Sequence, residues 1–176
     1  MISLQPGELY VSDQDDLVYT VLGSCVSVCL FDDINCIGGM NHYRLSARTT
    51  TAATRMEGMD QYGEEALADL LALMRQKGAM MSFLKAKVFG GASMSSVPPH
   101  EPSAVAHGNL SVAHRFLEAH DIQKVSENTG GNFARRILFH TSSGMVLMQP
   151  VERSKLDIAA PMLLGFKESR KEKEFR

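Results

Sequence analysis

Residues 17–31 read Leu-Val-Tyr-Thr-Val-Leu-Gly-Ser-Cys-Val-Ser-Val-Cys-Leu-Phe. Two apolar runs rich in β-branched residues, 17–22 and 26–31, lie on either side of a Gly-Ser pair. This pattern predicts two strands joined by a tight turn. Cys25 stands where the turn ends and the second strand begins. The stretch therefore predicts an early sheet with a cysteine at one of its corners.

The strand pattern continues on both sides of the centre of the chain. A polar hairpin connection at 32–35 leads into a third strand at 36–42, whose paired glycines indicate close backbone approach or a β-bulge. Further strands are expected at 84–89, 122–127, 135–140 and 144–149. The polar or proline-rich segments 46–59 and 93–106 are expected to be loops.

Two helices are predicted between the early and the late strands. Apolar spacing over 62–77 matches a helical period, and Gly78 is suited to end that helix. Asn109 is suited to cap a second helix that runs to His120. Early and late strands around two helices predict an α+β sandwich with mostly antiparallel sheets, in which the helices cover one side.

Length and composition indicate one domain, expected over residues 1–165, with a charged and frayed tail at 166–176. The 18 basic and 20 acidic residues give a net charge of −2, which argues against a nucleic-acid partner. No run of about 18 apolar residues is present, so no membrane insertion is expected. Three cysteines clustered between residues 25 and 36 do not resemble a secreted disulfide framework, so a cytoplasmic location is expected.

Cys25 and His42 are the residues best suited to form a chemical site. A thiol is a strong nucleophile, and a nearby imidazole is the usual group that converts it to a thiolate. His42 ends the third strand, and adjacent antiparallel strands can bring it within reach of Cys25. Backbone N–H groups around Gly23 and Ser24 are candidates to stabilise an oxyanion. A purely structural role stays open for both the cysteine and the histidine.

A zinc site is a further alternative for this cluster, using Cys25, Cys29, Cys36 and His42. The gaps between these cysteines do not match the short knuckles that usually hold zinc, and strand geometry separates the side chains. Cys29 and Cys36 lie in apolar runs and are expected to be structural. No metal and no other cofactor is therefore expected.

Four sequence blocks occur in a defined order: Leu-Gly-Ser-Cys-Val-Ser-Val-Cys-Leu at 22–30, Gly-Gly-Met-Asn-His at 38–42, Lys-Val-Phe-Gly-Gly-Ala at 87–92 and Thr-Gly-Gly-Asn-Phe-Ala-Arg-Arg at 129–136. Together they resemble the CheD family, the chemoreceptor glutamine deamidases of bacterial chemotaxis. The resemblance implies a three-layer α/β/β sandwich. It also implies hydrolysis of glutamine side chains to glutamate, with release of ammonia, on cytoplasmic helices of methyl-accepting chemoreceptors. Cys25 matches the family's nucleophile and His42 its general base.

The resemblance also implies a catalytic threonine shortly before the cysteine. Tyr19 lies six positions before Cys25, and Thr20 is one position nearer. A one-residue offset in a strand reverses the face of the side chain. Either Thr20 takes this role, or the orientation of the histidine is weakened.

Two other functions stay open alongside glutamine deamidation. The resemblance implies binding to a CheC-type phosphatase, so the chain can act mainly as a binding partner. The same thiol can also attack a glutamyl methyl ester, which would make the protein a receptor methylesterase.

Overall fold

The computed structural model describes residues 1–44, 63–93, 104–151 and 173–175. The helices are α1 (Gly63–Gln76), the short 3₁₀ helix η1 (Met81–Phe83) and α2 (Ala104–Ala119). The strands are β1 (Ile2–Ser3), β2 (Leu9–Ser12), β3 (Leu17–Leu22), β4 (Val26–Asp32), β5 (Ile37–Asn41), β6 (Leu84–Gly90), β7 (Gln123–Thr129), β8 (Ala134–His140), β9 (Val146–Val151) and β10 (Lys173–Phe175).

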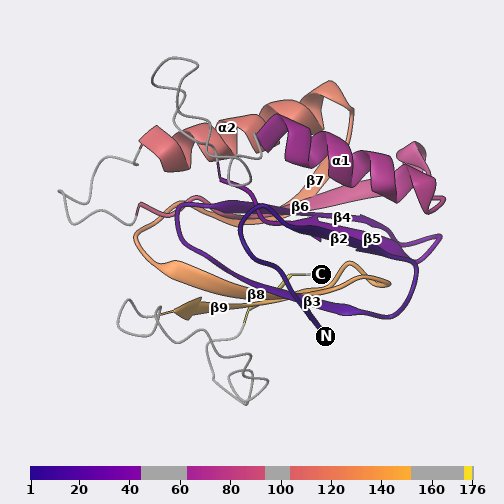
Figure 1. The fold of residues 1–176 in the computed structure, drawn as a ribbon, viewed down its shortest axis with the longest axis horizontal. Helices are drawn as coiled ribbons and strands as arrows, with labels where there is room; N and C mark the ends of the chain where they lie inside the picture. Colours follow the sequence, from indigo (N-terminus) through magenta and orange to yellow (C-terminus); the bar gives the residue numbers. More distant parts are fainter. Residues whose placement is uncertain (45–62, 94–103, 152–172, 176) are drawn as a thin grey trace.

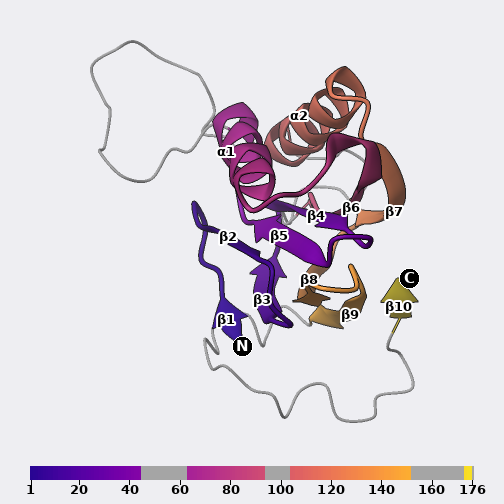
Figure 2. The same cartoon turned by 90° about the vertical axis from the view of Figure 1, so that its right-hand side faces the viewer.

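The described strands form two five-stranded sheets, which stack face to face beneath the two long helices (Figures 1 and 2). The sheet next to the helices has the order β2-β5-β4-β6-β7, and the outer sheet has the order β1-β3-β8-β9-β10. Most strand pairs are antiparallel, while β1–β3 and β6–β7 are parallel. The predicted three-layer α/β/β sandwich, with mostly antiparallel sheets and two main helices, is confirmed.

Strand β4 lies between two apolar layers, which explains its continuous apolar sequence. All seven of its residues are buried. Val26, Val28 and Leu30 pack in the core beneath the helices. Cys29 and Phe31 point the other way, into the core between the two sheets. Because side chains alternate along a strand, this alternation also fixes the face on which Cys25 lies.

Helix α1 forms as its apolar spacing predicts. Leu67, Leu70 and Met74 are buried on one stripe against the sheet. Beyond its end, Gly78 has a φ of +102° and its N–H bonds to the Arg75 carbonyl, while the next N–H reaches the Met74 carbonyl. This pair of bonds is the Schellman arrangement, which satisfies carbonyl groups at a helix end.

The prediction for the second helix was wrong at its start. Helix α2 begins at Ala104, so Asn109 is an interior residue and not an N-cap. The segment 104–106, expected to belong to a loop, is helical. The loop predicted at 46–59, and most of the loop predicted at 93–106, lie outside the described residues.

Two other differences concern the ends of the chain. The short strands β1 and β2 were not predicted, because their sequences give too few alternating positions. Residues Lys173–Phe175, expected to belong to a frayed tail, form β10, which pairs antiparallel with β9. No helix among the described residues is long and apolar enough to cross a membrane.

Candidate active site

Cys25 lies in the connection between β3 and β4, and it is half-buried. Hydrogen bonds from outside the turn hold the backbone that carries Cys25. The carbonyl groups of Gly23, Ser24 and Cys25 each accept one such bond at 2.8 Å. The donors are the N–H of Ala92 for Gly23, the Nδ2 of Asn109 for Ser24, and the N–H of Gly91 for Cys25. The cysteine is therefore presented by a rigidly held stretch of backbone.

Position 90 must be a glycine, because the backbone there lies very close to the carbonyl of Cys25. Gly90 pairs with Val26 across β6 and β4 and has a φ of +110°. A Cβ atom added to Gly90 would lie 2.1 Å from the carbonyl oxygen of Cys25. The Gly90-Gly91 pair therefore forms one wall of the cysteine turn.

Strand register brings Cys25 and His42 onto the same face. Val26 and Tyr43 pair by two backbone hydrogen bonds of 2.9 Å. The register is continuous with Cys29↔Met40, so His42 lies opposite position 27 and diagonal to Cys25. Diagonal neighbours on one face of an antiparallel pair can reach each other through long or aromatic side chains. Met40 and Cys29 identify this face as the one toward the outer sheet.

Thr20 approaches from the outer sheet. It lies in β3 between Val18 and Leu22, two residues whose side chains pack in the core between the sheets. Its Oγ1 is 2.8 Å from the Nδ1 of His42, and both residues are buried. Tyr19, the alternative position in the sequence, occupies the opposite face of β3 by alternation. The offset by one residue thus places Thr20, and not Tyr19, against the histidine.

The hydrogen bonds of Thr20 determine which nitrogen of His42 carries the proton. The Thr20 hydroxyl donates its single hydrogen to the Leu4 carbonyl at 2.8 Å. It can then only accept from His42, so Nδ1 carries the hydrogen and Nε2 carries the lone pair. Nε2 is buried and has no hydrogen-bond partner in the described part of the chain. The arrangement therefore presents an imidazole whose Nε2 is ready to accept a proton.

Burial shifts the ionisation of both groups toward their neutral forms. It lowers the pKa of His42 to about 4, although the Leu4 carbonyl and the charge of Glu8 act in the opposite direction. Burial also raises the pKa of the Cys25 thiol, partly opposed by the charge of Arg44 and by the backbone amide of Cys25. A low-dielectric site disfavours both charged forms, so these shifts favour a neutral thiol and a neutral imidazole over the thiolate that a nearby histidine would otherwise promote.

The other two cysteines differ from Cys25 in their exposure. Cys29 is fully buried in the core between the sheets, and burial raises the pKa of its thiol to about 12. Cys36 is exposed, contrary to the expectation of a buried structural residue, and it has a φ of +55° in the turn before β5. Within the described ranges, no three histidine, cysteine or acidic side chains gather as a metal site would require. The alternative zinc site therefore gains no support.

Comparison with known proteins identifies the family. The family profile described as CheD chemotactic sensory transduction matches residues 45–150. A relative from Zymomonas mobilis is 37% identical over 155 residues, covering 88% of this chain and 82% of its own length. Relatives from Hahella chejuensis (35% identical; 85% of this chain, 69% of the relative) and Sulfurimonas denitrificans (32% identical; 86% and 95%) are similar.

The chain belongs to the CheD family. All three relatives bear the name "Probable chemoreceptor glutamine deamidase CheD". The profile match begins after His42, so it does not include Thr20, Cys25 or His42.

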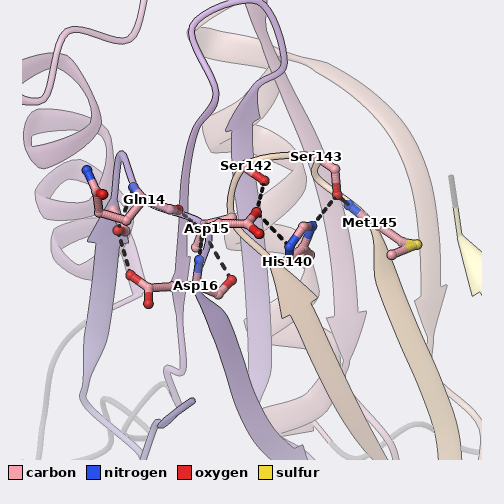
Figure 3. Close-up of polar contacts among 9 residues, drawn as sticks. Gln14, Asp15, Asp16, His140, Ser142, Ser143 and Met145 are labelled. Carbon is pink, nitrogen blue, oxygen red and sulfur yellow. Dashed lines mark hydrogen bonds and ion pairs between the residues drawn. The ribbon is translucent and has the colours of Figure 1, made fainter.

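A second histidine cluster lies where β3 begins and β8 ends (Figure 3). The ring of His140 lies between Asp15 and Ser143: its Nε2 is 2.8 Å from Asp15 Oδ1, and its Nδ1 is 2.7 Å from Ser143 Oγ. Ser142 also donates to Asp15. Both nitrogens of His140 are therefore engaged in linking two loops.

Asn109 is the residue near the cysteine turn that sequence reasoning misinterpreted. An asparagine before an apolar run is typical of a helix N-cap, but this residue is fully buried inside α2. An interior, buried polar residue needs a partner, and here that partner is the Ser24 carbonyl. Only knowledge of the true helix start could have suggested this role.

Proposed function

We propose that this CheD chain hydrolyses glutamine side-chain amides of chemoreceptors to glutamate, with Cys25 as nucleophile, His42 as general base and Thr20 as the residue that orients the imidazole. The observation that carries the proposal is the Thr20–His42 hydrogen bond at 2.8 Å. It leaves the buried Nε2 as a proton acceptor on the same strand face as the thiol. The names of the relatives indicate the substrate class.

The first half of the reaction forms a thioester. His42 Nε2 accepts the proton of the Cys25 thiol as the sulfur attacks the carboxamide carbon. Because burial favours the neutral form of both groups, proton transfer in this proposal accompanies the attack and does not precede it. The carbonyl π electrons move to oxygen, and the imidazolium then protonates the departing nitrogen as the C–N bond breaks. Ammonia leaves, and a γ-glutamyl thioester remains on the sulfur.

The second half hydrolyses this thioester. Neutral His42 accepts a proton from water as the water oxygen attacks the thioester carbon. The C–S bond breaks, the imidazolium returns a proton to the sulfur, and the glutamate product leaves. Throughout both halves Nδ1 keeps its hydrogen, because Thr20 accepts from it while donating to the Leu4 carbonyl.

The negative oxygen formed in both halves needs hydrogen-bond donors. The N–H groups of Ser24 and Cys25 are the candidates beside the sulfur. Neither group donates to another residue in the part of the chain that the structure describes. The carbonyls of this turn are all tethered, which supports a preorganised pair of donors.

The decisive experiment measures ammonia release from a recombinant chemoreceptor cytoplasmic fragment. We expect Cys25→Ala to abolish release, while Cys36→Ser, which alters an exposed cysteine outside the site, retains wild-type turnover. Mass spectrometry of the fragment then locates each amide that became an acid. Full turnover by Cys25→Ala would refute the nucleophile assignment.

The same assay separates the two alternative functions. Methanol release from a methylated receptor fragment would indicate methylesterase activity. If the wild-type protein releases neither product but binds a CheC-type phosphatase in a pull-down, the chain acts as a binding partner.

A further inference from the structure

Asn109 connects helix α2 to the backbone on both sides of the proposed site. Its side-chain Nδ2 donates to the Ser24 carbonyl at 2.8 Å, directly before Cys25. Its main-chain carbonyl accepts from the hydroxyl of Tyr43, directly after His42, also at 2.8 Å. Asn109 is fully buried. One interior residue of the helix layer thus contacts the neighbours of both proposed catalytic residues.

The direction of the first hydrogen bond determines the direction of the next amide. A trans peptide is planar, so the carbonyl of Ser24 and the N–H of Cys25 point in opposite directions. Asn109 belongs to α2, which covers the face of the β2-β5-β4-β6-β7 sheet that lies away from the outer sheet (Figure 2). The Ser24 carbonyl therefore points toward the helices, and the Cys25 N–H points away from them. That is the side on which the Cys25 and His42 side chains lie.

We propose that Asn109 is a positioning residue that orients the Ser24–Cys25 peptide, so that the Cys25 N–H donates to the oxyanion. The inference rests on the proposed deamidase function and identifies what prepares its oxyanion site. Asn109 does not touch the reacting atoms, because it acts through the peptide that it holds.

The chemistry of the contact favours an amide at this position. Ser24 is half-buried, and its carbonyl loses its protein donor if the Asn109 amide is removed, which is costly where water cannot replace that donor. An aspartate of the same shape would present a negative oxygen to that carbonyl and would favour rotation of the peptide. The tethers on Gly23 and Cys25 come from backbone N–H groups, so no substitution removes them simply. Of the three tethers that described residues make to this turn, the one from Asn109 comes from a side chain.

The test compares two reactions of the same sulfur. Amide hydrolysis needs an oxyanion site, whereas alkylation by iodoacetamide displaces iodide and forms no oxyanion. Asn109→Asp and Asn109→Ala are each made in a Cys36→Ser background. Each should lower kcat for ammonia release at least about tenfold, and the loss should approach the roughly 10²–10³-fold decrease that is typical when an oxyanion donor is removed. KM and the alkylation rate of Cys25 should change by less than about twofold. His107→Ala, an exposed position on the same helix, is the matched control and should retain wild-type kcat.

The aspartate variant adds a readout that a purely structural role would not give. Its carboxyl group becomes a donor again when protonated, so its kcat relative to wild type should rise as the pH is lowered. The alanine variant should show no such recovery. If Asn109→Ala does not fold, the isosteric aspartate variant decides the question.

Three outcomes would overturn the inference. The first is a folded aspartate variant with wild-type kcat at neutral pH. The second is an alkylation rate that falls in parallel with kcat, which would mean that Asn109 positions the sulfur and not the amide. The third is an aspartate variant that does not fold or shows no recovery at low pH, which would mean that the residue serves the fold. Absence of ammonia release by the wild-type protein would instead refute the proposed function itself.

Discussion

His42 and His140 each bond to a hydroxyl group, but their environments differ. His42 lies between the two sheets, with Nδ1 bonded to Thr20 and with Nε2 buried and lacking a partner among the described residues. His140 lies at the end of β8, half-exposed, with Asp15 on one nitrogen and Ser143 on the other. A histidine with both nitrogens engaged serves to join loops. One with a single nitrogen held in a fixed tautomer, on the strand face of a thiol, is suited to move protons.

Replacing each histidine with glutamine should give the largest difference in kcat between the two clusters. His42→Gln removes the proposed general base and should lower kcat for ammonia release by roughly 10²–10⁴-fold. His140→Gln should leave kcat within about twofold, because His140 is outside the proposed site. Steady-state ammonia release measures both, and equal losses in the two variants would erase the distinction between the clusters.

The burial of His42 should also make the stability of the fold depend on pH. The pKa of His42 is lowered from 6.5 to about 4 in the folded protein. Between these values the unfolded chain binds a proton that the folded chain does not, so stability falls as the pH is lowered. The expected loss is up to roughly 3 kcal/mol in the free energy of unfolding.

Chemical denaturation at several pH values tests this dependence. The His42→Gln variant should lose less stability than the wild type over the same interval, because its side chain does not titrate. Parallel pH curves for the two proteins would contradict the assignment of His42 as a buried neutral imidazole.

The hydroxyl of Thr20 should matter less than the imidazole but still measurably. Thr20→Val keeps the shape and removes the acceptor for Nδ1–H, so we expect kcat to fall roughly 10- to 100-fold. Thr20→Ser retains the hydroxyl and should recover most of the activity. A valine variant as active as the serine variant would mean that Thr20 does not orient the ring.

The smallest effect is expected in the His140 cluster. Ser143→Ala removes a partly exposed hydrogen bond to His140, so the free energy of unfolding should fall by less than about 1 kcal/mol, with kcat unchanged. Thermal denaturation and ammonia release measure the two quantities. A clear loss of turnover would show that this distant cluster influences the proposed site.

Much of this architecture follows from local pattern. Alternating and continuous apolar runs predict β3 and β4, helical spacing predicts α1, and Gly78 ends that helix, because strand and helix periods are properties of short segments. The same local reasoning failed at Asn109. An asparagine is equally suited to cap a helix or to bond a buried carbonyl, and the choice depends on where α2 begins.

The sequence alone identifies the candidate chemical groups: a cysteine after a Gly-Ser turn, a histidine at a strand end, and a threonine nearby. Their relation to one another depends on how the layers stack. Thr20 meets His42 because β3 belongs to the opposite sheet and turns its even-numbered side chains inward. The resting ionisation of the pair likewise depends on burial, which arises only when the sheets exclude water. Residue types and local periods are encoded over a few neighbouring positions, whereas facing partners and local dielectric are produced by contacts between distant segments.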